Sequence, residues 1–484
     1  MNPRYEAVIG LECHAQLLTR SKLFCSCSTR FGDAPNMNTC PVCLGLPGAL
    51  PVLNAAAVAM AAKAALALNC KVHAQSQWAR KNYFYPDLPK GYQISQYDRP
   101  LAENGFIEIS AGGVRKKIGI QRIHMEEDAG KSLHEGFADS SRSTCLDFNR
   151  SGVPLIEIVT APDIRNSEEA YDYLARLKQI LEYLDVCDGN MEEGSLRCDA
   201  NVSVRLKGAT EFGTRTELKN INSFRFVQKA IDYEVDRQID VIESGGRVMQ
   251  ETRLWNSAEE RTTPMRSKEQ AHDYRYFPEP DLPPLVVEPE WLRNIQQTMP
   301  ELPEPRRARF VAAYALSEYE AGVLTMTRAL ADFFEETARL SGQPKAAANW
   351  IMGDVLRFYK ESGVDLKDLS KSTVTPKMLA DMIVLVEQGT ISGKIAKTVI
   401  EEMYKTGKAP EAIVREKGLV QISNAAEIEQ IVEKVVKENP EPVALYKAGK
   451  TGTFGFLVGQ VMKATQGRAN PQTVNELLRK RLAS

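Results

Sequence analysis

The segment AVIGLECHAQL, residues 7–17, decides the fold of the first part of this chain. Its side chains alternate in character, so that Glu12 and His14 stand two positions apart with Cys13 between them. A β-strand sends successive side chains to opposite faces of its sheet. The segment therefore predicts a strand with one apolar face and one face that carries an acid and a histidine.

Three later segments repeat this alternation. It gives single faces to Arg122, His124 and Glu126 in IGIQRIHMEED (118–128), to Asp199, Asn201, Ser203 and Arg205 in RCDANVSVRL (197–206), and to Arg215, Glu217 and Lys219 in GTRTELKN (213–220). For any single glutamate, a solvated strand position explains the residue equally well. Four strands that present acids, histidine and Arg/Lys together favour a basin for a divalent metal and phosphate.

Carboxylates and water are the ligands that Mg²⁺ prefers, together with the phosphate oxygens of a nucleotide. The candidate metal ligands in this basin are Glu12, His14, Glu126, Glu127 and Glu217. Arg205, Arg215 and Lys219 are candidate phosphate clamps, because guanidinium and ammonium groups pair with phosphate oxygens.

A second metal signal lies in the cysteines. Cys25, Cys27, Cys40 and Cys43 form a C-x-C-x12-C-x2-C pattern with turn residues between the pairs. Two close pairs of thiolates deliver the tetrahedral geometry of structural Zn²⁺. The competing explanation is four unrelated buried cysteines. We expect the remaining five to pack as small apolar side chains: Cys13, Cys70, Cys145, Cys187 and Cys198.

The tract RKNYFYPDLPKGYQISQY (80–97) interleaves aromatic and basic residues, including Lys81, Tyr83 and Tyr85. Such residues can stack on and position a nucleotide or an RNA end. Tyrosines packed in a core loop explain the tract equally well. The segment AGKT (448–451) resembles the end of a phosphate-binding loop, but Ala444 stands where that motif needs glycine.

Composition describes an ordinary globular chain of 484 residues with 43% hydrophobic and 26% charged residues and a net charge of −2. Only the end is locally basic, with seven Lys/Arg against two acids from Glu441 to Ser484, which suits a polyanion. A solvated basic tail without function is the alternative. The sequence shows no signal peptide or membrane span, and its odd number of cysteines favours a reducing cytoplasm without disulfides.

Residues 1 to about 290 look rich in strands, with two helical interruptions. One is the Ala-rich run 55–68, and the other is capped by Asn166 and buries Ala170, Leu174, Leu177, Leu181 and Leu184. A proline-marked passage, RYFPEPDLPPLVVEPEW (275–291), predicts a linker or domain edge near 290. Helical periodicity follows from 301 to about 405, and a third unit begins near 410.

Long tracts resemble one family, the B subunits of the tRNA-dependent amidotransferases (GatB). The resemblance runs nearly end to end and rests on VIGLECHAQL (8–17), RKNYFYPDLPKGYQISQ (80–96), HMEEDAGKS (124–132), DFNRSGVPLIEIVT (147–160), MEEGSLRCDANVS (191–203), TELKNINSF (216–224), DYRYFPEPDLPPL (273–285) and GFLVGQVMKATQGRANP (455–471). It implies an α+β chain: a mainly antiparallel-sheet cradle domain with helices (1–293), an all-α helical domain (294–408) and a small α-helical, YqeY-like, tRNA-binding tail (409–484).

The resemblance also implies an activity, that of a carbon–nitrogen ligase using glutamine as nitrogen donor. ATP phosphorylates the side-chain carboxylate of misacylated Glu-tRNA(Gln) or Asp-tRNA(Asn), and ammonia released by the A subunit then displaces phosphate, in a heterotrimer with the A and C subunits. The metal set carried over is Glu12, His14, Glu126, Glu127 and Glu217, with Asp199 and Lys219 as phosphate-side or ammonia-path groups. Which tRNA product is made stays open. The four-cysteine zinc site occurs in only some members of the family, and all four cysteines are present here. Whether zinc occupies the site stays open.

Two other functions compete. A non-catalytic, zinc-containing tRNA-binding scaffold would use the cysteines and the tail but not the acids. A Mg²⁺-dependent nuclease would use the same acids without ATP. Neither accounts for the match along the whole chain.

Overall fold

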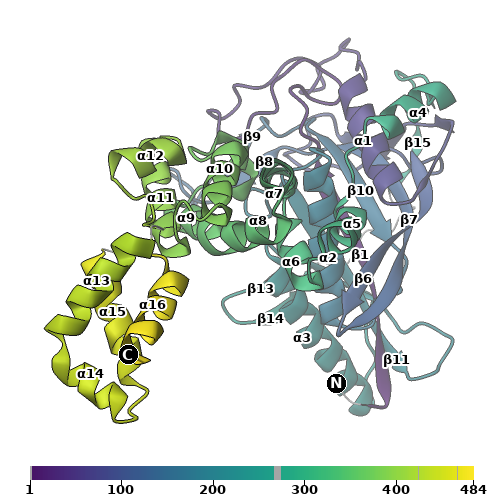
Figure 1. Cartoon of the computed structure of the whole chain (residues 1–484). Coiled ribbons are helices and arrows are strands. Elements are labelled where there is room, and N and C mark those ends of the chain that lie inside the picture. Colours follow the sequence, from purple (N-terminus) through teal and green to yellow (C-terminus); the bar gives the residue numbers. More distant parts are fainter. Residues whose placement is uncertain (1–2, 266–273, 423–424, 466, 484) are drawn as a thin grey trace. The chain divides into compact units, whose positions relative to one another are not determined.

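The computed structural model describes residues 3–265, 274–422, 425–465 and 467–483. The chain forms two compact units, Met1–Leu302 and Pro303–Ser484 (Figure 1). The first unit is built on β-sheets, and the described residues of the second are almost entirely helical. This is the expected α+β class. The predicted boundaries at 293 and 408 stay predictions.

A nine-stranded sheet forms the base of the first unit, in the order β14-β13-β12-β11-β1-β10-β7-β6-β2. Every described pair of neighbours is antiparallel except β12 with β13. The strands are β1 (Tyr5–Gln16), β2 (Lys71–Val72), β6 (Ala102–Ala111), β7 (Val114–Glu127), β10 (Pro154–Thr160), β11 (Leu196–Leu206), β12 (Thr216–Lys219), β13 (Thr252–Asn256) and β14 (Arg261–Pro264).

Three small sheets accompany it. They are β15 (Phe277–Pro278) with β4 (Ala79–Asn82) and β5 (Tyr92–Ser95), β16 (Leu285–Val286) with β3 (Gln75–Ser76), and β8 (Lys131–Leu133) with β9 (Cys145–Asp147). The prolines of the passage 275–291 therefore do not make a free linker. Its two short strands pair with β4 and β3, and Glu279 forms a buried ion pair with Arg80 at 2.7 Å.

Helices cover the apolar face of the large sheet. Both predicted helices are present as α1 (Ala55–Ala67) and α2 (Ser167–Tyr183). The Asn166 side chain caps α2 by accepting from the Glu169 amide, and the predicted apolar stripe of α2 is buried. Figure 1 shows α2 and α3 lying against the sheet, and their core residues form one cluster with Leu11, Cys13 and Ala15 of β1.

The sequence prediction missed helix α3 (Phe224–Glu243), which is capped by Ser223. Its buried face contains Glu234 and Gln238 among apolar residues, and both polar side chains are fully buried. Glu234 is compensated by Arg237 at 2.6 Å and by a hydrogen bond from Gln238 at 2.8 Å. These polar positions interrupt the apolar period that marks an amphipathic helix.

The second unit contains helices throughout. They are α5 (Pro303–Tyr314), α6 (Glu318–Leu324), α7 (Arg328–Ser341), α8 (Pro344–Trp350), α9 (Leu356–Ser362), α10 (Pro376–Glu387), α11 (Gly393–Thr406), α12 (Pro410–Glu416), α13 (Ala425–Glu438), α14 (Pro440–Lys447), α15 (Thr453–Ala464) and α16 (Pro471–Ala483), with a π turn at Ile351–Val355 and a 3₁₀ helix at Leu366–Lys371. One more helix, α4 (Pro289–Gln297), ends the first unit and contacts α1.

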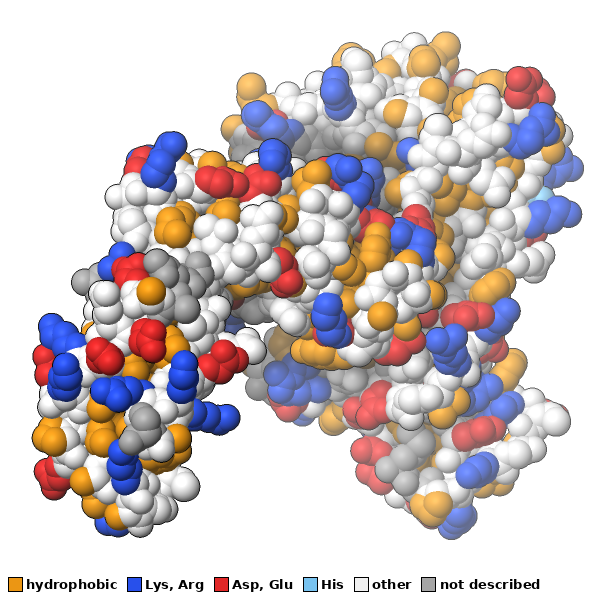
Figure 2. Space-filling model, in the orientation of Figure 1, with side chains coloured by type: hydrophobic (Ala, Val, Ile, Leu, Met, Phe, Trp, Pro, Cys, Tyr) orange, Lys and Arg blue, Asp and Glu red, His pale blue; other side chains and the backbone are white. Residues whose placement is uncertain are grey.

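Two separate apolar cores stabilise the helical unit. One gathers buried residues from Phe310 to Val414, and the other gathers residues from Ile428 to Leu482. Figure 2 shows basic, acidic and apolar side chains intermingled over the region of α13 to α16. Among the described residues, no helix is both long and apolar enough to cross a membrane.

Candidate functional site

Strand register gathers the polar residues of five adjacent strands on one face of the large sheet. Cα pairing sets Glu12 opposite Asp199, and it sets His14 between Arg197 on β11 and Glu157 on β10. It also pairs Glu157 with His124 and Asn201 with Glu217. Paired residues on antiparallel strands point to the same face. The predicted polar face is confirmed, and it runs unbroken from β12 to β7.

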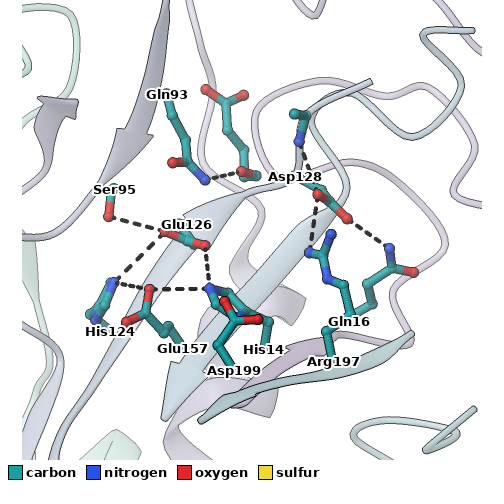
Figure 3. Close-up of polar contacts among 12 residues, drawn as sticks. His14, Gln16, Gln93, Ser95, His124, Glu126, Asp128, Glu157, Arg197 and Asp199 are labelled. Atoms are coloured by element: carbon teal, nitrogen blue, oxygen red, sulfur yellow. Dashed lines mark hydrogen bonds and ion pairs between the residues drawn. The ribbon is translucent and has the colours of Figure 1, made fainter. Parts of the chain in front are cut away.

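Two histidines and two glutamates form the centre of this face. Glu157 Oε2 lies 3.2 Å from His14 Nε2 and 3.3 Å from His124 Nε2. Glu126 completes the group at 3.6 Å from His14 and 3.7 Å from His124 (Figure 3). Ligand atoms of His14, Glu126 and Glu157 all lie within 4.8 Å of one another, which is close enough to bind one metal ion.

Electrostatics favour charged forms throughout this group. Burial lowers the pKa of His124, but the carboxylates of Glu157 and Glu126 outweigh burial and raise the pKa to about 9. Burial alone would raise the pKa of Glu157, but His124 and His14 hold it well below its ordinary value. Burial also lowers the pKa of His14, but Glu157 and Glu126 outweigh it and raise the pKa overall. Metal binding through His14 must displace its proton.

The group opens to solvent on the side of His14. The side chain of His14 is 19% exposed, whereas His124 is 4% exposed. One imidazole and two carboxylates fill three positions around an ion and leave others for water and phosphate oxygens. This donor set fits the expected Mg²⁺.

A lysine among three acids forms the neighbouring part of the face. Lys219 contacts Asp199 and lies 3.6 Å from Glu217 Oε1. Glu12 stands opposite Asp199 and accepts a hydrogen bond of 2.9 Å from Asn201. Burial lowers the pKa of Lys219, but Asp199, Glu217 and Glu12 raise it above its ordinary value. Lys219 is therefore a positive charge that these three acids hold on the sheet face.

Beyond the end of β7, Asp128 binds two arginines. Its carboxylate is 3.1 Å from Arg197, 3.7 Å from Arg150, and accepts a hydrogen bond of 2.8 Å from Gln16 (Figure 3). Burial opposes the charge of Asp128, but Arg197 and Arg150 lower its pKa. The two guanidinium groups remain about one-third exposed, which leaves donors for a ligand.

A cavity of about 520 Å³ opens beside this corner. Arg150, Arg197 and Lys131 line it together with Asp199, and the loop Met191–Gly194 forms part of its wall. Its size lies within the range of sites that hold small molecules, roughly 300 to 1,000 Å³. The cavity therefore joins basic groups to the acidic face.

Three sequence-predicted site residues lie away from these groups. Glu127 follows Glu126 directly in β7, so it points to the opposite side, where it pairs with Lys90 and accepts from the Ile94 amide at 2.9 Å. Arg205 pairs with Glu6 at 2.7 Å, six positions along β11 from Asp199 and roughly 20 Å away. Arg215 is exposed, and neither arginine lines the cavity.

The predicted aromatic tract stands close to the acids. Lys81 lies over the rings of Tyr274 and Tyr83, at 4.9 and 5.8 Å. Burial lowers the pKa of Lys81, but Glu126 and other nearby groups raise it overall. The ring of Tyr83 contacts that of Tyr85, whose side chain is more than half exposed. Each of the two interpretations of this tract therefore fits one residue: Tyr83 is partly buried, as in core packing, and Tyr85 is exposed, as on a binding surface.

The four cysteines form the expected cluster. Their sulfur atoms all lie within 4.8 Å of one another, and those of Cys40 and Cys43 are 3.9 Å apart. Zn–S bonds of about 2.3 Å in a tetrahedron require S···S separations of about 3.8 Å. A hydrogen bond with Cys25 lowers the pKa of Cys43 to about 4, and the Cys40 amide and Lys22 act in the same direction. The residues fit structural zinc.

All nine cysteines are free. Cys13, Cys70, Cys187 and Cys198 are buried as predicted, but Cys145 is exposed on β9, so the prediction for that residue was wrong. Among the described strands, β9 pairs with the short β8 in a two-stranded sheet outside the large one.

Sequence reasoning missed four residues of the site: Glu157, Asp128, Arg150 and Arg197. Glu157 stands alone in the apolar strand PLIEIVT, where periodicity gives no polar pattern. A lone carboxylate in a central strand is itself a signal, because a buried charge needs a partner. Arg197 extends the alternation of Asp199 and Asn201 by one step and could have been found that way.

Buried histidines and carboxylates with shifted pKa values beside a cavity are typical of an enzyme active site. Comparison agrees, because residues 7–293 match the sequence model described as the GatB/GatE catalytic domain, and residues 332–482 match that of the GatB domain. The chain belongs to the GatB family of amidotransferase subunits.

Three relatives illustrate how far the likeness extends. Each is named as the B subunit of an aspartyl/glutamyl-tRNA(Asn/Gln) amidotransferase. The protein of Carboxydothermus hydrogenoformans is 58% identical over 99% of both chains. That of Thermoanaerobacter pseudethanolicus is 58% identical over 99% of this chain and all of its own. That of Thermodesulfovibrio yellowstonii is 57% identical over 98% of both chains.

Proposed function

We propose that this protein activates the side-chain carboxylate of an amino acid esterified to tRNA. ATP phosphorylates the carboxylate of Glu-tRNA(Gln), Asp-tRNA(Asn) or both, and glutamine-derived ammonia then displaces phosphate to form the amide. Carboxylate oxygen is a poor leaving group, so an acyl phosphate lowers the barrier to attack. The observation that carries the proposal is the group of His14, Glu126 and Glu157 together with a cavity of nucleotide size that Arg150 and Arg197 line.

The carboxylates of Glu126 and Glu157 and the imidazole of His14 would hold Mg²⁺. When bound, Mg²⁺ offsets the negative charge on the transferring phosphoryl group. Glu12 and Glu217 flank this position on the same face and would hold water or a second ion. His124 keeps Glu126 and Glu157 oriented, since its Nε2 atom contacts both carboxylates.

The cavity would receive the nucleotide. Asp128 holds the guanidinium group of Arg197, and the carbonyls of Ala129 and Gly130 hold that of Arg150. Both groups suit phosphate oxygens. Lys219 lies where it can neutralise charge between the nucleotide and the acids. Arg205 and Arg215, considered from sequence, have no support from this geometry.

The tRNA end and the ammonia reach the same face in this proposal. Lys81, Tyr83 and Tyr85 offer cationic and aromatic groups next to Glu126 for a base or a ribose. The basic end of the chain would hold the body of the tRNA. Ammonia would come from the A subunit of a cytoplasmic heterotrimer, in which the C subunit is the third member.

A reconstituted complex with the A and C subunits tests the proposal. Glutamine, ATP and each misacylated tRNA are supplied, and ADP and amide are measured. Glu157→Gln should abolish both products while tRNA binding stays intact. A tRNA-binding scaffold predicts unchanged amide formation by this variant. A nuclease predicts cleavage of the tRNA without ATP. Either result would refute the proposal, and the two tRNA substrates distinguish the Gln from the Asn product.

A further inference from the structure

Lys22 is a completely buried lysine that the proposed reaction does not use. Its ammonium donates to the carbonyl of Asn38 at 2.6 Å, to the carbonyl of Phe148 at 3.1 Å, and to Cys43 Sγ at 3.6 Å. Each of its three hydrogens therefore has an acceptor. The hydrogen bonds are complete, but two of the three acceptors carry no formal charge.

No carboxylate forms an ion pair with Lys22 among residues 3–265 and the other described ranges. Glu127 lines the same small cavity of about 200 Å³, but it is already paired with Lys90. A buried ammonium without a negative partner is expensive, because burial removes the hydration of the charge. Among the described residues, the only negative group that the Lys22 ammonium contacts is the sulfur of Cys43.

A zinc ion with four thiolates carries a net charge of −2 and resolves this imbalance. The Lys22 ammonium would then compensate half of that charge through its contact with Cys43. We propose that Lys22 is the charge-balancing partner of a tetrathiolate zinc centre and that it links this centre to the loop 148–153.

The link follows from the backbone contacts. Lys22 binds Phe148 directly, and the neighbouring Leu23 amide donates to the Gly152 carbonyl at 2.8 Å. The Gly152 amide in turn donates to the Asp128 carbonyl at 2.8 Å. The loop also contains Arg150, which contacts Asp128. Hydrogen bonds and one ion pair thus connect the zinc ligand Cys43, through Lys22 and the loop 148–153, to Asp128.

Zinc affinity of the full chain tests the proposal, measured by competition with a chromogenic chelator at constant pH. Lys22→Met keeps the length of the side chain and removes the charge. Its zinc affinity should fall about 10- to 100-fold, as for other groups that hydrogen-bond to metal ligands. Lys71→Met, which removes an exposed positive charge on β2, is the control and should retain zinc as the wild type does.

The metal-free protein separates charge balance from packing. Without zinc, Lys22→Met should lower the melting temperature less than it does in the zinc-bound protein, because the Cys43 sulfur alone offers Lys22 less negative charge than a zinc centre of charge −2. Hydrogen exchange at 148–153 should rise in the zinc-supplied variant. Unchanged zinc affinity, or equal destabilisation of the metal-free and zinc-bound proteins, would overturn the proposal. Neither measurement requires ATP or tRNA, so the result is independent of the proposed reaction.

Discussion

Two consecutive glutamates, Glu126 and Glu127, serve opposite sides of β7. Glu126 faces His14 and Glu157, while Glu127 pairs with Lys90 in a separate buried contact. We expect Glu126→Gln to lower the affinity for Mn²⁺, used as a probe of the Mg²⁺ site, at least tenfold, since it removes one of three charged or imidazole ligands. Calorimetric titration of the wild type and of Glu126→Gln with Mn²⁺ measures this effect.

Glu127→Gln is the matched control for that titration. It should keep the metal affinity but lose about 3 kcal/mol of stability, because Lys90 is left buried without its charge partner. Equal loss of metal affinity in the two variants would show that both carboxylates reach one ion, contrary to their placement on β7.

Arg197 and Arg205 offer a second comparison, because they lie on the same face of β11. Arg197 lines the cavity beside Asp128, whereas Arg205 is occupied by Glu6. Arg197→Met should weaken ATP binding by about 10- to 100-fold, the value of one or two charge-assisted hydrogen bonds. Arg205→Met should leave the affinity for ATP unchanged. Equilibrium binding of a fluorescent ATP analogue measures both affinities. A larger loss of ATP affinity in Arg205→Met than in Arg197→Met would show that the nucleotide binds near Arg205, at the other end of β11.

Alternation in the sequence was enough to predict which side chains share the polar face. It could not reveal Glu157, because the surrounding strand is apolar on both sides and its partners come from β1 and β7. The pair Glu126–Glu127 was predicted to bind metal together, although the same alternation rule sends one of them away. Alternation placed Arg205 and Arg215 on the polar face but could not show how far they lie from the acids along the sheet. That distance depends on the register of the strands.

Helix α6 illustrates an element whose stability is set by its first turn. Ser317 and Glu320 form a capping box, and Lys345 pairs with Glu320 at 2.8 Å. Hydrogen bonds from Lys345 and Ser317 lower the pKa of Glu320 to about 2. Because the folded pKa lies below the unfolded one, this stabilisation is complete above about pH 4.5 and is lost as the pH falls toward 2.

Glu320→Gln removes this dependence. At neutral pH it should cost a few tenths to about 1 kcal/mol, since Lys345 is largely exposed and its contribution is screened. Hydrogen exchange of the α6 amides should be faster in the variant at neutral pH, and the difference should shrink as the pH falls toward 3. A constant difference across that range would exclude the Glu320 carboxylate as its origin.

Element prediction succeeded where one period dominated. The buried stripe of α2 and its Asn166 cap were readable from sequence, as was the Ala-rich α1. Helix α3 failed because Glu234 and Gln238 occupy its buried face, and their compensation comes from residues of the same helix and of β13 and β14. The interpretation of 275–291 as a free linker was wrong for a similar reason, since its pairing partners lie some 200 positions earlier in the chain. The alternative, a domain edge near 290, agrees more closely with a first unit that ends at Leu302.

The cores of the second unit divide its helices into two sets that share no buried residue. Ile413 and Val414 of α12 belong to the first set, so a truncation that preserves that core must end beyond them. A chain ending at Gln421 removes α13 to α16 and the core from Ile428 to Leu482. It also removes all seven basic residues that follow Glu441.

This truncated chain, assembled with the A and C subunits, should keep ATP binding, because the cavity and the metal group lie entirely in the first unit. It should bind misacylated tRNA at least tenfold more weakly, with a smaller dependence on salt, because each lost phosphate contact removes a released counterion. Fluorescence anisotropy at several salt concentrations measures both quantities. An unchanged affinity with an unchanged salt slope would show that the basic end of the chain does not hold the tRNA, and the phosphate contacts would then have to come from the sheet-based unit.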